Sequence, residues 1–278
     1  MIIINQNSYL NEILKKLRSF CKSKCIILHS DLFKLGFYRR DFTYHQNLNL
    51  IHDSIMNIFH DFQIIVPTFN YDFVDSKIFD IKNDKAQVGA LNEYFRKNYI
   101  LNRTHTPIFN IITTKKSKII KKTPCKDPHG KMSFYNIAYI NGYDIILLGK
   151  FIPSMAHFVE RKIKVPYRYI KKISGTIKKH DGKMIPITLL YNVRPNLKKH
   201  ILIDNRRIKY DLEKNKLLKC IKNNNNFLGC YNAKEVSEFW IKENLSNYMY
   251  FLTKKSKLNA KHFLTKFGNP LKVQKIEQ

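Results

Sequence analysis

The chain contains no apolar run close to the roughly 20 residues that a helix needs to cross a bilayer. Its longest apolar stretches, such as residues 145–149, have the length of buried strands. The N-terminus is apolar, but it lacks the basic stretch and the small-residue cleavage site of a signal peptide. We therefore expect a cytoplasmic protein that does not insert into a membrane.

Cysteine is scarce and irregularly spaced. An odd number of cysteines without an export signal indicates reduced thiols in a cytoplasm rather than a disulfide framework. Cys21 and Cys25 lie four positions apart, which does not match the usual CxxC metal knuckle, and no His/Cys pair follows at zinc-finger spacing. The sequence therefore predicts no metal site.

Acidic residues are few, and the formal net charge is +29. The imbalance is largest from Arg161 to Lys222, where 19 basic residues stand against four acidic ones. Such a field attracts anionic partners: nucleic acid, an acidic membrane surface or phosphorylated small molecules. The alternative is a general abundance of lysine, much of which only forms a solvated surface.

Short apolar runs alternate with helical patterns over the first 160 residues, which predicts a layered α/β domain. Residues 70–86, rich in Asp, Asn and aromatics, are expected to form an irregular loop. Helices are expected around 10–17, 48–58, 88–97 and 154–162, and strands around 25–28, 64–66, 108–114 and 144–148.

Past Pro166 the pattern changes to strand-like stretches at 185–193 and 200–203, with turn signals at 180–182 and 204–205 and a flexible loop at 223–226. Helical patterns resume at 233–243 and 258–266. We therefore predict an α/β/α sandwich with a central mixed sheet, formed by residues 1–166 and 227–278. A small, basic, β-rich subdomain would span residues 167–226, and its exposed surface would suit a homodimer contact.

The first polar motif is His29-Ser30-Asp31-Leu32, between a predicted strand and a short helix that ends near Gly36. The N–H groups and the positive dipole end of such a helix bind phosphate or pyrophosphate. The alternative is an ordinary capped turn, which many α/β proteins contain.

The second motif, Ser154 to Glu160, follows a strand that ends at Gly149. In open α/β sheets ligands bind beyond the carboxyl ends of the strands. His157 and Glu160 lie three positions apart on one helix face, and a carboxylate so placed fixes the tautomer of an imidazole and raises its basicity. His157 is thus a candidate general base for an attacking amine. The alternative is a surface His–Glu pair without a catalytic role.

The third motif places acidic residues among aromatic ones: Asp72, Asp80 and Glu93. Aromatic rings stack on the apolar face of a sugar, and carboxylates accept hydrogen bonds from its hydroxyls or pair with an ammonium group. The alternative is that these residues only cap loops and Asx turns.

In their order along the chain, these motifs resemble the aminoglycoside 3-N-acetyltransferase family. The resemblance covers residues 8 to about 175, and Pro166-Tyr167-Arg168 is similar to members outside the antibiotic-resistance branch. The matching stretches are residues 29–36, 67–72, 79–80, 88–96, 103–107, 147–149 and 154–160.

The resemblance implies that acetyl-CoA and an amino sugar meet in a ternary complex, where the amine attacks the thioester directly. His157 would take the amine proton and Glu160 would orient His157. The resemblance also implies that the coenzyme is bound by His29, Ser30, Asp31, Leu32 and Ser154. At the position of Ser154 the family usually has Thr. Acceptor binding would fall to Asp72, Asp80 and Glu93.

Two positions depart from the family pattern near the acceptor side. The usual Arg-Ser-x-His-Pro reads Arg103-Thr-His-Thr-Pro107 here, so that His105 is displaced by one position. Asn110 stands where the family usually has Ser three residues past that proline.

The charge of the chain bears on the acceptor. A strongly basic protein steers polycationic aminoglycosides poorly, which favours an anionic acceptor: a nucleotide-linked amino sugar or an amine of a surface glycan. An aminoglycoside acetyltransferase of antibiotic resistance is the first alternative. The second is a non-enzymatic nucleic-acid-binding protein, although no nucleic-acid-binding signature accompanies its candidate stacking residues, Tyr167, Tyr169, Tyr191 and Tyr210.

Overall fold

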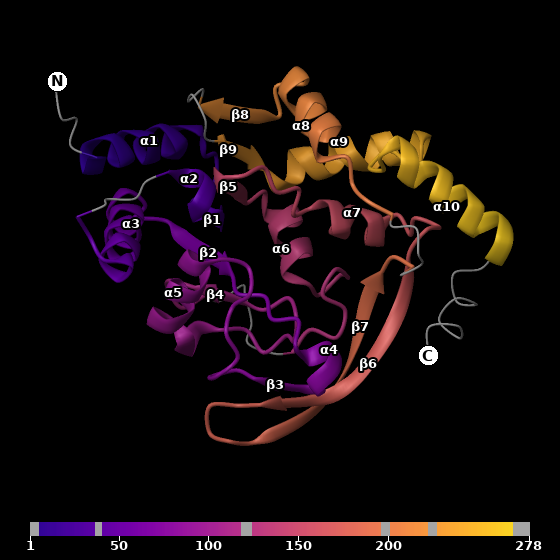
Figure 1. Ribbon diagram of the computed structural model, residues 1–278, viewed down its shortest axis with the longest axis horizontal. Coiled ribbons are helices and arrows are strands. Elements are labelled where there is room, and N and C mark those ends of the chain that lie inside the picture. Colours follow the sequence, from indigo (N-terminus) through magenta and orange to yellow (C-terminus); the bar gives the residue numbers. More distant parts are fainter. Residues whose placement is uncertain (1–5, 37–40, 118–123, 196–200, 222–226, 269–278) are drawn as a thin grey trace.

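The computed structural model describes residues 6–36, 41–117, 124–195, 201–221 and 227–268. Within them a six-stranded mixed sheet runs through the molecule in the order β4-β2-β1-β5-β9-β8 (Figure 1). Strand β1 pairs in parallel with β2 and β5, and the other pairs are antiparallel. The predicted central mixed sheet is confirmed. Its strands are β1 (Cys25–Ser30), β2 (Gln63–Pro67), β4 (Ile111–Thr113), β5 (Asp144–Gly149), β8 (Leu218–Ile221) and β9 (Phe227–Asn232).

Helices cover both faces of this sheet, because successive strand side chains point to opposite sides. In β1, Ile26 and Leu28 belong to one apolar cluster and Ile27 to the other. The first cluster includes α1 (Gln6–Phe20), α3 (Tyr44–Ile58) and α5 (Ala90–Asn98). The second includes α6 (Phe134–Asn141), α7 (Ala156–Lys162) and α9 (Ala233–Ser246). The predicted layered α/β/α arrangement is confirmed.

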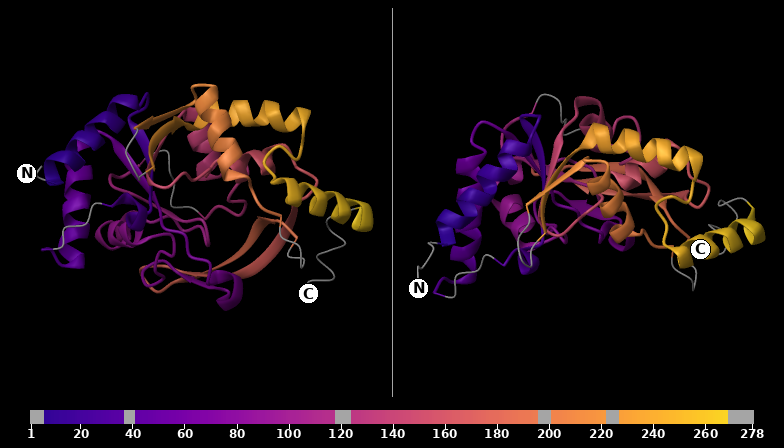
Figure 2. Two further views of the ribbon diagram at one scale, coloured as in Figure 1. Left: turned by 45° about the horizontal axis from the view of Figure 1, so that its top comes forward. Right: turned by 90° about the horizontal axis from the view of Figure 1, so that it is seen from above.

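The helices form where the apolar spacing predicts them. In α1, Leu10, Leu14 and Leu17 are at most 1% exposed, and each buried leucine contributes roughly 1.5–3 kcal/mol. A capping box between Thr43 and Gln46 starts α3. Figure 2 shows α1 at one end of the molecule and α10 (Lys254–Phe267) at the other. None of the described helices combines the length and apolar character of a bilayer-spanning segment.

The stretch 70–86, expected as an irregular loop, instead contains α4 (Phe73–Ser76) and β3 (Ile78–Asp80). Phe73 and Phe79 are fully buried and hold the stretch on the core. A short 3-10 helix, η1 (Ile100–Asn102), leads to Arg103, whose guanidinium lies 4.9 Å from the Phe79 ring. Helix α6 was also not predicted; the side chain of Ser133 caps it by accepting from the N–H of Asn136.

A second, three-stranded sheet in the order β3-β6-β7 contains the long ribbon of β6 (Tyr169–Lys178) and β7 (Met184–Val193), which curves away from the central sheet (Figure 1). This sheet confirms the small β-rich part of the predicted fold. The predicted turn at 204–205 is wrong: Asp204 caps helix α8 (Asn205–Lys214) by accepting from the N–H of Arg207.

The segment 167–226 is therefore mixed, and its last strand, β8, pairs with β9 in the central sheet. In the predicted strand 200–203, Ile203 forms only an isolated bridge with Leu252. His200 and the loop 223–226 lie outside the described residues. The division into units at residues 166 and 226 stays a prediction.

Candidate active site

A cavity of about 890 Å³ opens at the carboxyl ends of β1, β2 and β5, the edge at which α/β sheets bind ligands. His29 and Ser30 line it from the end of β1, and Pro67 from the end of β2. Ser154 and His157 line it from the segment that follows β5. Four of the predicted site residues thus share one cavity: His29, Ser30, Ser154 and His157.

The contact between two strand ends brings these residues together. The N–H of Asp31 donates to the carbonyl of Leu148 at 2.8 Å. Gly149 has φ +90°, and a Cβ there would lie 2.3 Å from the carbonyl oxygen of Asp31. Only glycine allows the end of β5 to lie this close to the turn after β1, which explains the glycine of the matching stretch 147–149.

His157 stands on α7 with its Nδ1 atom 3.0 Å from Oε2 of Glu160. The carboxylate is fully buried and also accepts a hydrogen bond from the Tyr167 hydroxyl at 2.9 Å. Two guanidiniums reach it as well: Arg168 at 2.7 Å and Arg194 at 3.3 Å. We call these five residues the Glu160 cluster.

The charges of the cluster set the protonation of its members. Burial alone would raise the pKa of Glu160, but the charges of Arg168 and Arg194 hold it well below its usual range. Burial in the cavity wall and the charge of Arg168 lower the pKa of His157 to about 4. The side chain keeps 40% of its surface exposed, and water at this surface weakens the effect of burial on its pKa. The charge of Arg168 still lowers the pKa. His157 is thus neutral at pH 7, as a general base must be.

His129 also lines the cavity, although it was not among the predicted site residues. It is 2% exposed, stacks on Tyr135 at 5.1 Å and lies edge-on to His157 at 5.9 Å. Neither of its ring nitrogens has a hydrogen-bond partner among the described residues, and burial lowers its pKa well below the usual value. No motif or spacing in the sequence marks this histidine.

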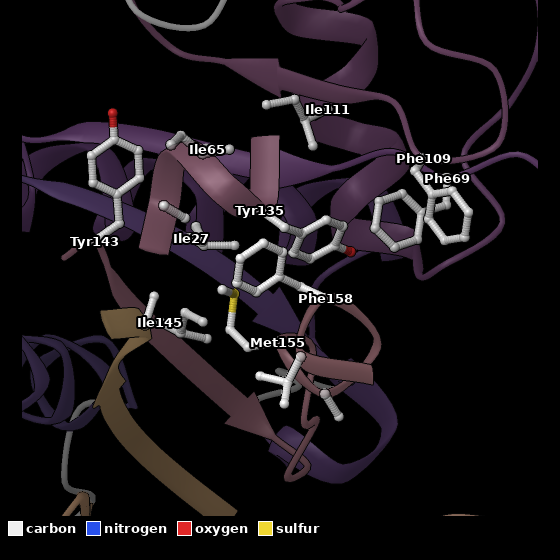
Figure 3. Packing of buried hydrophobic residues seen from close by; sticks show 14 of the residues in the cluster. Ile27, Ile65, Phe69, Phe109, Ile111, Tyr135, Tyr143, Ile145, Met155 and Phe158 are labelled. Atoms are coloured by element: carbon white, nitrogen blue, oxygen red, sulfur yellow. The ribbon is translucent and has the colours of Figure 1, made fainter. Parts of the chain in front are cut away.

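Aromatic side chains form the apolar wall of the cavity, and Figure 3 shows three of them: Phe69, Phe109 and Tyr135. The rings of Phe69 and Phe109 meet edge to face at 5.2 Å. Tyr191 of β7 contacts Phe109 at 5.6 Å, so the second sheet closes the cavity opposite the central one.

The cavity lining carries basic side chains and no carboxylate among its described residues. The lining contains Arg168 and Arg194 and three histidines, and no Asp or Glu occurs among its described residues. Burial lowers the pKa of His29 to about 4, which keeps this histidine neutral like the others. The fixed charge on the described cavity wall is therefore that of the two arginines, and the buried carboxylate of Glu160 opposes it.

Two residues predicted to bind the coenzyme, Asp31 and Leu32, lie outside this cavity. Asp31 caps helix α2 (Leu32–Leu35) by accepting from the N–H of Lys34 at 3.3 Å, and Gly36 ends that helix with φ 72°. Leu32 lines a separate, mostly apolar pocket of about 300 Å³ next to Phe33.

The three acidic residues predicted for the acceptor side also lie outside the cavity lining. Asp72 accepts from the side-chain amide of Gln87 at 2.7 Å. Asp80 accepts from the N–H groups of Lys82 and Asn83 and pairs with Lys178 at 3.1 Å. These contacts hold the chain between β2 and α5 in its irregular course.

Glu93 has partners of the same kind. It forms a two-point ion pair with Arg96, with both distances 2.7 Å, and accepts from the N–H of Ala86 at 2.7 Å. Partner side chains and N–H groups within the fold thus occupy all three predicted acceptor carboxylates, and the structure does not bring them to His157.

The departures from the family pattern belong to the same supporting layer. Asn110 is fully buried; its side-chain oxygen accepts from the hydroxyl of Thr68 at 2.6 Å and from Nε of Arg103 at 2.9 Å. His105 is not part of the cavity lining. Within the described residues, no group of three or more His, Cys, Asp or Glu side chains is placed to hold a metal ion.

The fold of the chain is similar to that of several solved structures, aminoglycoside acetyltransferases among them. The apoenzyme of aminoglycoside acetyltransferase AAC(3)-IVa matches with a TM-score of 0.66 and 15% identity, covering 89% of this chain and 91% of that one. The YokD protein from Bacillus subtilis matches with a TM-score of 0.64 and 14% identity, over 85% and 93%. AAC-IIIb in its binary complex with CoASH matches with a TM-score of 0.65 and 16% identity, over 85% and 95%.

A family model for aminoglycoside 3-N-acetyltransferase matches residues 60–243. The chain belongs to the aminoglycoside 3-N-acetyltransferase family, which confirms the resemblance seen in its motifs. It is therefore an enzyme of the acetyl-CoA-dependent N-acetyltransferase class. Among curated protein sequences, no significant match to the chain is found.

Proposed function

We propose that this enzyme transfers the acetyl group of acetyl-CoA to the amine of an amino sugar that carries an anionic group. Such an acceptor is a nucleotide-linked amino sugar or an amine of a surface glycan. Family membership supports the reaction, and the relative AAC-IIIb binds CoASH. The enzyme would thus serve surface-polysaccharide or glycoconjugate synthesis.

The reaction joins the acceptor nitrogen to the acetyl carbonyl carbon. The carbon–sulfur bond of the thioester breaks, coenzyme A leaves as the thiol or thiolate, and His157 accepts the proton that the nitrogen loses. Glu160 stays ionised and orients the imidazole. Ser30 and Ser154 share the cavity with His157, which supports their assignment to the coenzyme side together with His29. Asp31 and Leu32 would contribute to coenzyme binding from the segment that directly follows Ser30.

The side chains that line the cavity support the choice of an anionic acceptor. Two guanidiniums face the cavity, while no carboxylate occurs on its described lining. Each charge-assisted hydrogen bond to an anion contributes roughly 1.5–3 kcal/mol. The ammonium groups of a polycation would find no such partner, and the two arginines would repel them.

Aminoglycoside acetylation is the alternative within the family. Structures of AAC(3)-IVa contain a gentamicin or apramycin, and AAC-VIa binds sisomicin. In this chain the three candidate carboxylates for a cationic acceptor, Asp72, Asp80 and Glu93, have partners elsewhere, which weighs against that substrate.

Binding of nucleic acid as the main function has little support from the proposed stacking residues. Tyr167 and Tyr169 are buried, and Tyr191 lines the cavity. Tyr210 alone of the four is largely exposed, at 62%. The homodimer contact and the cytoplasmic location remain predictions.

Thiol release from acetyl-CoA tests the proposal. The panel comprises a nucleotide-linked amino sugar, glucosamine 1-phosphate, glucosamine and an aminoglycoside. We expect turnover with the two phosphorylated sugars and a loss of about 100- to 10,000-fold in His157→Ala. The control variant His262→Ala changes a histidine of α10 that is not part of the cavity lining, and should keep full activity. Release with the aminoglycoside alone would overturn the acceptor. No release at all, with salt-sensitive binding of oligonucleotides, would contradict the enzyme function.

A further inference from the structure

One nitrogen of Arg168 contacts both members of the His157–Glu160 pair. Its Nη2 atom lies 2.7 Å from Nδ1 of His157 and 2.7 Å from Oε2 of Glu160. A guanidinium only donates hydrogen bonds. An imidazole nitrogen that accepts from it therefore carries no proton.

The two contacts of Nδ1 compete with each other. Were Nδ1 protonated to donate to Glu160 at 3.0 Å, its hydrogen would meet an N–H of Arg168 across 2.7 Å. Since the contact with Arg168 is the shorter one, Nδ1 is the acceptor in this arrangement. The proton of the neutral ring is then on Nε2, the nitrogen left for the substrate, and Nε2 in this tautomer cannot accept a proton.

The Glu160 cluster also holds more positive than negative charge. One carboxylate faces two guanidiniums, whose side chains are 6% exposed for Arg168 and 18% for Arg194. The Nε atoms of both arginines are buried without a partner among the described residues. A buried charge without a full counter-charge is unfavourable, so an anion that enters the cavity has a binding partner ready in Arg168.

We propose that Arg168 is a positioning residue that makes the base competent only when an anionic group occupies the cavity. The anion draws the guanidinium away from Nδ1. The ring then loses its Nε2 proton to water and takes one at Nδ1, with no change in net charge. Nδ1–H donates to Glu160, and Nε2 is free to accept the proton of the acceptor amine. This inference rests on the proposed function for the identity of the anion, which is the charged group of the acceptor.

The groups that face His157 come from several elements. Glu160 lies on α7 itself, Tyr167 and Arg168 precede β6, Arg194 follows β7, and His129 precedes α6. Of these, only Arg168 and Glu160 contact Nδ1. A change of tautomer therefore reports on these two contacts and not on the general charge of the site.

Nitrogen-15 NMR of the histidine rings in the full-length enzyme tests the inference without turnover. The signal of His157 is assigned from its absence in His157→Gln. At neutral pH we expect an unprotonated Nδ1 and a protonated Nε2 in the free enzyme, and the reverse on titration with inorganic phosphate or glucosamine 1-phosphate. A protonated Nδ1 in the free enzyme would overturn the inference, as would a tautomer that neither titration changes. Both results leave the proposed acetyl transfer standing, since thiol release measures that separately.

Two matched variants separate the contact from the charge. Arg168→Met should place the proton on Nδ1 without any anion. Arg194→Met removes an equal charge from beside the same carboxylate, but Arg194 does not contact Nδ1. In this variant the tautomer of His157 should therefore remain that of the wild type. In Arg168→Met the preference for glucosamine 1-phosphate over glucosamine, measured as kcat/KM, should fall by roughly 10- to 100-fold. An unchanged preference would contradict the coupling, and if the variant does not fold, the wild-type titration decides.

Discussion

Two buried groups of residues, one around Arg103 and the other the Glu160 cluster, differ in how completely the hydrogen bonds of their arginines are satisfied. Around Arg103, whose side chain is fully buried, four oxygen atoms accept from the guanidinium: the side chain of Asn110 and the carbonyls of Thr68, Ile81 and Asp84. In the Glu160 cluster both arginines keep a buried Nε without a partner among the described residues. The guanidinium of Arg103 is thus fully paired within the fold, although Nδ2 of the neighbouring Asn110 has no partner among the described residues. The guanidiniums of Arg168 and Arg194 are not fully paired, and they line the cavity.

This difference separates a structural site from a functional one more clearly than residue type does. Both groups contain arginine with nearby carboxylates, and both lie next to the predicted motifs. Burial and the charge of Arg96 lower the pKa of Arg103 to about 9, yet Arg103 lines no part of the cavity. A perturbed pKa alone would have marked both groups, whereas of the two only the Glu160 cluster combines guanidiniums that keep an unpaired donor with a place on the cavity lining.

The largest expected effect is the loss of stability in Arg103→Met. Four oxygen acceptors would lose their donor in a buried site, at a cost of about 3–5 kcal/mol in the free energy of unfolding. Urea unfolding followed by circular dichroism measures it. The control is Arg161→Met, which removes a half-buried arginine paired with Asp127 at 2.8 Å and should cost about 1 kcal/mol or less. Equal losses in the two variants would show that the four oxygen acceptors around Arg103 add no more stability than a half-buried ion pair does.

A second prediction concerns the neutral histidines of the cavity. His29 is 7% exposed, and burial lowers its pKa to about 4. The unfolded chain binds a proton near pH 6.5, so stability is full above that pH and falls as the pH drops from about 6.5 toward 4. The slope is about 1.4 kcal/mol per pH unit for one such group, or roughly 2 kcal/mol between pH 6.5 and pH 5.

Urea unfolding at pH 6.5 and at pH 5 measures this loss, and His29→Asn should remove most of the part that His29 contributes. His60, on the surface beyond α3 and exposed, provides the control: His60→Asn should leave the slope unchanged. A flat stability between these pH values in the wild type would mean that the cavity histidines are protonated or solvated in the folded protein.

The layered fold follows largely from local patterns in the sequence. The 3.6-residue spacing in α1 and the continuous apolar run of β1 each dictate one element, because their side chains must reach two different cores. Asp204-Asn205 led to the wrong element, since the same side chain that closes a turn also caps a helix. The short pieces α4 and β3 could not be predicted because Phe73 and Phe79, which hold them, bury themselves against parts distant in sequence.

The site was predictable to a smaller degree. The spacing of His157 and Glu160 identifies a pair, and the strand end at Gly149 identifies its location. Arg168 reaches Glu160 from the short segment between α7 and β6. Arg194 reaches it only because β6 and β7 form a ribbon, with Lys171 opposite Tyr191, that returns the chain to α7. Net charge predicted a basic surface, but the charge of the cavity depends on these two arginines alone.

The smallest expected effect tests whether the acidic loop takes part in binding. Asp72 was predicted to contact the acceptor, but its carboxylate accepts from Gln87 and Asn70 and does not line the cavity. Asp72→Asn should therefore change the KM for the amino sugar by less than about twofold and lower the stability by about 1 kcal/mol or less. Steady-state kinetics with glucosamine 1-phosphate measure the first value, and urea unfolding measures the second. Gln87→Ala removes this hydrogen bond from its other end, together with the one that Gln87 accepts from the N–H of Tyr71 at 2.7 Å. Its effect on KM should be equally small, and its loss of stability about 1–2 kcal/mol. A tenfold rise in KM in Asp72→Asn alone would restore the role that the sequence predicted, and would show that a carboxylate with partners inside the fold still reaches the acceptor during the reaction.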